Sequence, residues 1–168
     1  GIVEKLKEAG LTPLMITGGG TGTHHIDAGL GVFNEWQVGS YVFMDRQYHD
    51  CDLAEGAKPF ETSLFVDAHV ISANAPSMAT IDAGFKALST DGGSPSIAAG
   101  APESSAFFFM GDEHAALIAP GHEFKLGDAV SLGVPHCDPT VNLYEAYHIV
   151  RGDTLIDIWP VSARGRSR

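Results

Sequence analysis

The sequence predicts a mixed fold, in which the terminal units of a β/α barrel are followed by a small all-β domain. Helical and strand-like patterns alternate over residues 1 to about 45, as they do in parallel β/α structures. From about residue 60 onward, short strand-like runs alternate with turn residues at near-regular spacing, which is typical of a sandwich or barrel. We therefore assign residues 1–50 to an incomplete barrel and residues 51–168 to a C-terminal β domain.

The first region contains one helix and two strand candidates. Residues 2–9 have the apolar spacing of a helix, and Gly10 follows as a stop signal. Residues 13–17 form an apolar run before a glycine loop, which indicates a strand buried on both faces. Residues 40–45 predict a second buried strand. A complete barrel takes roughly 200 residues or more, so these elements fit only its closing units.

The second region contains six strand candidates. Glycine, proline and aspartate separate them, which indicates tight turns between short strands. The candidates are residues 63–71, 79–82, 105–110, 129–132, 146–150 and 154–159.

Composition restricts the class of protein. The 168 residues are 44% apolar, which is enough for a core, and carry a net charge of −11. That charge argues against nucleic acids and anionic membrane surfaces as partners. No apolar run approaches the ~20 residues of a membrane helix, and the two cysteines are too few for a disulfide framework, so we expect a cytoplasmic protein with reduced thiols. Because the chain starts at Gly1 inside a helical pattern, we also expect a fragment of a longer chain.

A glycine-rich loop at residues 17–23 directly follows the first strand candidate. Backbone N–H groups of glycines and threonine hydroxyls can together hold a phosphate, helped by a following helix N-terminus. The spacing matches neither a P-loop nor a dinucleotide fingerprint. Phosphate binding and a flexible turn are therefore the two interpretations of this loop.

The second candidate site is the stretch of residues 135–140. If it is extended, His136 and Asp138 point to one side and Cys137 to the other. An imidazole with a carboxylate suits Mn²⁺, Mg²⁺ or Zn²⁺, and two protein ligands leave an open site. The alternative is a histidine at a strand end that is hydrogen-bonded to a nearby aspartate.

Two further groups could carry chemistry. His114 follows two carboxylates in residues 111–114, which indicates either acid/base groups or a solvated turn. Lys86 lies between apolar residues and could form a Schiff base if its pKa were lowered. A lysine whose apolar stem covers the surface is the commoner explanation.

The sequence resembles the D-threonine aldolase family, which belongs with the D-serine dehydratases and has an alanine racemase-type fold. The resemblance runs in order from about residue 10 to residue 166. The segments that carry it are TGGGTGT (17–23), GSYVFMD (39–45), DAGFKALS (82–89), DEH (112–114), HCDPTVNLY (136–144) and the closing WPV and ARG.

The resemblance implies a TIM-type barrel that holds pyridoxal 5'-phosphate, followed by a β domain with a divalent-metal site. The implied metal ligands are His136 and Asp138, with Mn²⁺ as the expected ion and Mg²⁺ or Zn²⁺ as alternatives. His114 is a candidate for the surroundings of the cofactor or the metal. The residues implied to hold the cofactor are Gly18, Gly19, Gly20, Thr21 and Tyr41.

The implied reaction is retro-aldol cleavage of a D-β-hydroxy-α-amino acid to glycine and an aldehyde, by a homodimer. The base is left open between a water on the metal and a histidine. The related dehydratases have Cys where this chain has Asp138, which favours the aldolase. The family's Schiff-base lysine lies before Gly1, and Lys86 does not match its motif, so we expect the 168 residues alone to be inactive.

Three alternatives stay open. The same fold could eliminate water from D-serine or D-threonine, or racemise an amino acid. A catalytically silent β module that binds a metal is the alternative outside the enzymes.

Overall fold

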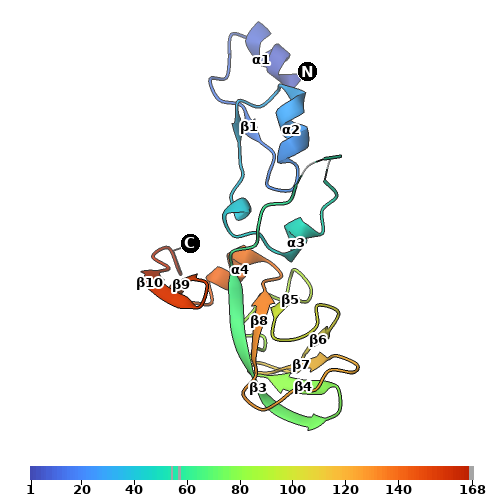
Figure 1. Cartoon of the computed structure of the whole chain (residues 1–168). Coiled ribbons are helices and arrows are strands. Elements are labelled where there is room, and N and C mark those ends of the chain that lie inside the picture. Colours follow the sequence, from blue (N-terminus) through green and yellow to red (C-terminus); the bar gives the residue numbers. More distant parts are fainter. Residues whose placement is uncertain (54, 57, 167–168) are drawn as a thin grey trace.

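The computed structural model describes residues 1–53, 55–56 and 58–166. Its chain forms three parts, which Figure 1 shows as an elongated N-terminal region, a curled β sheet and a separate hairpin. None of the described helices is long and apolar enough to cross a membrane.

The N-terminal region contains a β-α-β unit. Helix α1 spans Ile2–Glu8, and Gly10 follows it with a φ of +74°, as the predicted stop requires. Strand β1 (Thr17–Gly18) leads through helix α2 (His24–Leu30) to strand β2 (Glu35–Trp36). The two strands pair in parallel, which agrees with the predicted β/α character of this region.

The two buried strands predicted here are wrong in detail. Within residues 13–17 only Thr17 belongs to a strand, and Leu14 is 96% exposed. Residues 40–45 begin with a 3₁₀ helix, η1 (Ser40–Val42), and lead into helix α3 (Arg46–His49). The carbonyl of Ser40 accepts hydrogen bonds from the amides of residues 43 and 44. These local bonds use backbone groups that a strand would offer to its neighbours.

The β domain is a single antiparallel sheet of six strands in the order β5-β8-β3-β4-β7-β6. Four of the strands were predicted, and β5 and β7, which are rich in alanine, were not. The strands are β3 (Phe65–Ala75), β4 (Met78–Ile81), β5 (Ser96–Ala99), β6 (Ala106–Phe109), β7 (Ala115–Ile118) and β8 (Ala129–Gly133).

Strand β3 joins the two halves of the sheet. Its first residues alternate strictly between exposed and buried and pair with β8, whereas its second half pairs with β4 across register shifts. Such irregularities bend a strand and increase its twist. Both halves contribute to one core, which includes Val66, Ile81, Leu117 and Leu132. The predicted small β domain is therefore confirmed as a curled sheet around its own core.

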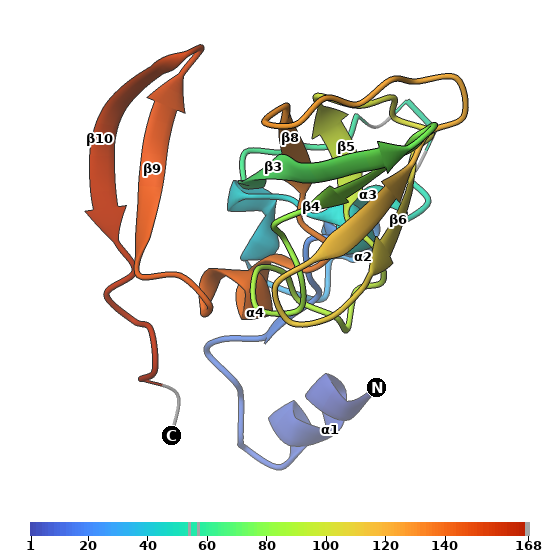
Figure 2. The same ribbon diagram turned by 90° about the horizontal axis from the view of Figure 1, so that it is seen from below.

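The sheet continues into a short helix and a hairpin. Helix α4 (Cys137–Val141) follows β8, and strands β9 (Ala146–Arg151) and β10 (Thr154–Pro160) form a separate two-stranded sheet. Figure 2 shows this hairpin standing to one side of the six-stranded sheet. Every residue of β10 is exposed.

Candidate functional site

The predicted metal motif lies at the junction of β8 and α4. Val134 and Pro135 are buried directly after β8, and His136 is extended at the N-cap of α4. The prediction of an extended stretch holds for His136 but is wrong from Cys137 onward, where the chain is helical. The helix still turns Cys137 into the core and leaves Asp138 exposed, so the predicted separation of their side chains is found.

The backbone of this junction is held by a distant serine. The His136 amide donates to Ser89 Oγ (3.2 Å), and the His136 carbonyl accepts from both Ser89 Oγ (3.1 Å) and Thr140 Oγ1 (2.8 Å). The Ser89 amide donates in turn to Thr140 Oγ1 at 3.1 Å. Ser89 and Thr140 are buried, so these bonds are shielded from water. The position of His136 is therefore fixed by its backbone as well as by its ring.

A buried carboxylate joins the junction to the N-terminal region. Asp45 is 1% exposed; its Oδ1 accepts from the Tyr48 amide (3.1 Å) and its Oδ2 from the Cys137 amide (2.8 Å). One side chain thus caps the first turns of both α3 and α4. The sequence predicted Asp45 only as the last residue of a strand, and its role as a cap was missed.

Two carboxylates contact opposite nitrogens of the His136 ring. Asp91 Oδ2 lies 2.7 Å from Nδ1, and Asp138 Oδ2 lies 3.4 Å from Nε2. The hydrogen bond from His136 holds the pKa of Asp91 below its usual range. Asp91 was predicted only as a turn residue. The alternative of a histidine bonded to a nearby aspartate therefore has a counterpart in the structure, beside the pair predicted to bind metal.

The two residues predicted to bind a metal, His136 and Asp138, have the geometry of an open two-ligand site. Among the described residues, no group of three or more His, Cys, Asp or Glu side chains is arranged to hold a metal ion. The 3.4 Å between His136 Nε2 and Asp138 Oδ2 can be bridged by one divalent ion bound to each atom at about 2.1 Å. A borderline nitrogen and a hard oxygen suit the ions that the sequence predicts.

Cys137 takes no part in this pair. It is 3% exposed, and burial raises the pKa of its thiol to about 12. Its Sγ donates a hydrogen bond to Asp138 Oδ2 at 3.4 Å. Because a thiolate, not a thiol, is the metal ligand, Cys137 supports its neighbour as a donor.

The predicted phosphate loop leads from β1 into α2. Gly19 adopts a φ of +71°, and the Gly20 amide donates to Thr23 Oγ1 at 3.3 Å. Thr21 is 4% exposed, and its hydroxyl oxygen has no hydrogen-bond partner within the described residues. Such a buried, unpartnered group is rare and fits a ligand that would bond to it. The carboxylate of Asp27, bonded to Thr23, occupies the side of Gly19 where a Cβ would point.

Tyr41 is joined to this loop by a chain of aromatic contacts. The Tyr41 and Phe60 rings lie 5.5 Å apart, and the Phe60 and His24 rings 5.2 Å apart. The Nδ1 atom of His24 is hydrogen-bonded to the Thr21 carbonyl at 2.7 Å. The structure therefore brings Tyr41 and the loop to one side of the N-terminal region, with Tyr41 on a 3₁₀ helix instead of a strand.

His114 and Lys86 lie at a second turn. The backbone of residues 111 and 112 accepts hydrogen bonds from the amides of Phe85 and Lys86, and Lys86 forms an ion pair with Glu113. Within the described residues, no hydrogen bond joins His114 to either residue of the metal pair, and its role stays a prediction. The Lys86 side chain is exposed, and its hydrogen bond with Glu113 raises its pKa. A Schiff-base amine needs the opposite shift, so Lys86 is a surface residue.

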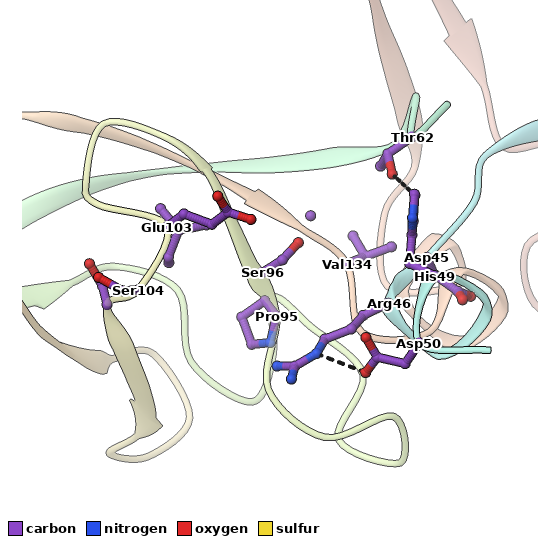
Figure 3. Close-up of a pocket in the computed structure, with 13 residues that line it drawn as sticks. Asp45, Arg46, His49, Asp50, Thr62, Pro95, Ser96, Glu103, Ser104 and Val134 are labelled. Carbon is purple, nitrogen blue, oxygen red and sulfur yellow. Dashed lines mark hydrogen bonds and ion pairs between the residues drawn. The ribbon is translucent and has the colours of Figure 1, made fainter. Parts of the chain in front are cut away.

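A cavity of about 530 Å³ lies between α3 and the β5–β6 region (Figure 3). Several of its lining side chains are engaged with other residues of the chain: Arg46 contacts Asp50 at 3.2 Å, and His49 Nε2 contacts Thr62 Oγ1 at 2.8 Å. It contains none of the residues predicted for the cofactor or the metal.

The fold is that of the alanine racemase-like proteins, the class that the sequence predicts. Residues 63–150, from the start of the sheet into β9, match the family model described as "Putative serine dehydratase domain". The chain belongs to this serine dehydratase family, and the predicted resemblance to D-threonine aldolases is confirmed within it.

Comparisons with individual relatives support the same family membership. The chain is 42% identical to a D-threonine aldolase of Arthrobacter sp over 165 residues, covering 97% of this chain and 43% of the relative. It is 37% identical to a 3-hydroxy-D-aspartate aldolase of Paracoccus denitrificans (strain Pd 1222), covering 98% of this chain and 43% of the relative. The crystal structure of the D-threonine aldolase from Filomicrobium marinum matches with a TM-score of 0.91 at 35% identity, covering 99% and 46% of the two chains. The chain thus spans less than half the length of these relatives.

Proposed function

We propose that this chain forms the metal-binding and cofactor-phosphate-binding part of a lyase that cleaves D-β-hydroxy-α-amino acids to glycine and an aldehyde. The observation that carries the proposal is the pair of His136 Nε2 and Asp138 Oδ2, held 3.4 Å apart at the exposed start of α4. The similarity to two aldolases whose names specify β-hydroxy D-amino acids supports the substrate class.

The metal pair would act on the substrate hydroxyl. His136 and Asp138 would hold one divalent ion, with Mn²⁺ as the first candidate, and leave its other positions open to substrate and water. Such an ion, when bound, would supply Lewis acidity that orients the hydroxyl and lowers its pKa. Ser89 and Asp45 would keep the two ligands in place, because both bond to the backbone that carries them.

The glycine loop would hold the phosphate of pyridoxal 5'-phosphate. The unpartnered Thr21 hydroxyl and the flanking glycines 18–20 fit an anion with several acceptor oxygens. The cofactor, when bound, would supply an electron sink for the electrons released by Cα–Cβ cleavage. Tyr41 would lie near the bound cofactor, because its ring contacts Phe60, and Phe60 contacts His24 beside the loop. The resemblance implies a Schiff-base lysine whose motif Lys86 does not match, and the Lys86 amine is paired with Glu113, so we infer that the 168 residues alone have no lyase activity.

Elimination of water is the second candidate function. The family model that matches the chain is described by serine dehydratase, which supports it. Asp138 favours the aldolase over the dehydratase. The resemblance implies a cysteine thiolate at this position in the dehydratases, and a carboxylate is a harder metal ligand than a thiolate. A racemase, a homodimeric assembly and a cytoplasmic location stay predictions.

The test is an assay of the full-length gene product with pyridoxal phosphate and D-threonine, with and without Mn²⁺. We expect metal-dependent formation of acetaldehyde and glycine. Formation of 2-oxobutyrate would instead assign the protein to the dehydratases. If D-threonine yields none of these products, and 3-hydroxy-D-aspartate yields neither glycine and glyoxylate nor oxaloacetate, the proposed lyase is wrong.

The metal ligands are tested by His136→Ala and Asp138→Ala in the same protein. Each change should remove the metal response almost completely, because two protein ligands leave no redundancy. His148→Ala and Asp153→Ala are the matched controls, since both residues are exposed in the β9–β10 hairpin. An unchanged Mn²⁺ response in either ligand variant would contradict the assignment.

A further inference from the structure

The contact between Asp91 and the His136 ring carries an inference that rests on the proposed metal site and extends it. We propose that Asp91 is a positioning residue, whose carboxylate fixes the His136 ring with Nε2 free to bind a metal. The carboxylate lies 2.7 Å from Nδ1, on the edge of the ring opposite to Asp138.

The chemistry of the two groups sets the ring's tautomer. An ionised carboxylate can only accept a hydrogen bond, so Nδ1 must carry the hydrogen that it donates to Asp91. In a neutral imidazole the other nitrogen, Nε2, then carries a lone pair. That lone pair lies on the side of Asp138 Oδ2, where the second proposed ligand is found. The carboxylate therefore selects the form of His136 that a metal needs.

The segment that carries Asp91 is packed firmly against the metal motif. Two residues before Asp91, Ser89 exchanges hydrogen bonds with the backbone of His136. One residue after it, Gly92 approaches so closely that a Cβ there would lie 2.7 Å from the Pro135 carbonyl oxygen. These contacts on both sides place Asp91 beside the ring, although its own side chain is half exposed.

This arrangement is a recurrent device of metal sites. A histidine ligand usually donates its other N–H to a carboxylate, which fixes the ring's orientation and raises the ligand's basicity. Loss of such a partner typically costs about 10- to 100-fold in metal affinity. We expect the same range for Asp91→Ala, and a smaller loss for Asp91→Asn, whose amide oxygen can still accept from Nδ1.

The first test measures Mn²⁺ affinity of the full-length gene product, from the electron paramagnetic resonance signal of free Mn²⁺. Asp91→Ala should bind about 10- to 100-fold more weakly than the wild type, Asp91→Asn should lie between them, and Asp153→Asn should equal the wild type. If the wild type binds Mn²⁺ and Asp91→Ala binds equally well, Asp91 has no positioning role. If the wild type itself does not bind, the metal site fails and the Asp91 proposal fails with it.

The second test needs no metal. Long-range ¹H–¹⁵N correlation spectra of the metal-free protein in mildly alkaline buffer report which ring nitrogen carries the hydrogen. The wild type should show His136 protonated at Nδ1, and Asp91→Ala should shift it toward Nε2, with the other histidines unchanged. The same tautomer in both proteins would overturn the proposal, whereas unfolding of the variant would disturb every histidine signal.

Discussion

The two proposed binding regions are held in different ways. The metal motif is attached to a sheet with its own apolar core, which Cys137 itself joins. In the described residues 1–53, which include the glycine loop, only Thr21, Met44 and Asp45 are buried. Helices α1 and α2 bury no residue. Within this chain, the metal motif is therefore held by packing and the glycine loop by local hydrogen bonds.

This difference predicts how firmly each site resists local opening. A site fixed by a core opens only when the core opens, whereas a site held by surface bonds opens at little cost. The described residues include a cysteine near each site, fully buried leucines in the core of the sheet, and the Asp45 carboxylate between the two regions. Each offers a test of the comparison.

The largest expected contrast is in the reactivity of the two cysteines. Cys51 is exposed, whereas Cys137 is buried in α4 with a thiol pKa of about 12. At pH 8 such a thiol is ionised in only about one molecule in ten thousand, and the thiolate is the nucleophile. We expect iodoacetamide to label Cys51 at least roughly a thousandfold faster than Cys137 in the folded protein. Peptide mass spectrometry over a time course measures both rates.

The control for accessibility is the same reaction in guanidinium, where both cysteines should react at similar rates. The labelling rate of folded Cys137 should rise steadily with pH as long as the pH is below its raised pKa, because the thiolate fraction rises with pH over that whole range. Rapid labelling of Cys137 under native conditions would show that α4 opens often. The metal motif would then be no better held than the N-terminal region.

Core packing gives the next largest effect. Leu117 of β7 is fully buried, and its replacement by alanine removes contacts and leaves a cavity. We expect Leu117→Ala to lower the free energy of unfolding by about 2–5 kcal/mol. Leu14→Ala, the same change at a side chain that is 96% exposed, should alter it by about 0.5 kcal/mol or less. Urea unfolding followed by near-ultraviolet circular dichroism compares the two, and equal losses would refute the comparison.

What could be predicted from the sequence depends on whether a feature is set by neighbouring residues or by distant ones. Alternating apolar residues predicted strand β3, and spacing alone paired His136 with Asp138, because both patterns are local. The residues that hold the motif were missed because they are distant: Ser89 and Asp91 lie more than 40 positions before the residues they contact. No short pattern records such contacts.

Local bonds explain the missed elements of the N-terminal region. Residues 40–45 have the apolar composition of a strand, yet the Ser40 carbonyl binds two nearby amides and turns the chain. In the sheet, β5 and β7 were missed because alanine has low β-propensity and these strands form through pairing with β8 and β4. Local hydrogen bonds decided the first outcome, and pairing with distant strands decided the second.

Asp45 gives the smallest expected effect and tests whether the two regions are coupled. Its buried carboxylate accepts hydrogen bonds from the amides of Tyr48 and Cys137, one in each region. Asp45→Ala leaves both amides without this acceptor, and because a hydrogen bond typically contributes about 0.5–1.5 kcal/mol, the two together contribute about 1–3 kcal/mol. We expect a loss of that size in unfolding free energy, with faster hydrogen exchange at Cys137.

Asp50→Ala is the matched control, because Asp50 is exposed and, among the described residues, its carboxylate forms an ion pair only with Arg46 at the surface. Such surface pairs contribute at most about 1 kcal/mol, and this one does not touch α4. If Asp45→Ala accelerates exchange in α3 but leaves Cys137 protected, the β domain holds the metal motif without help from the N-terminal region. If exchange rises in α3 and α4 together, Asp45 links the proposed metal site to the segment that carries Tyr41, and a change at either site reaches the other through one side chain.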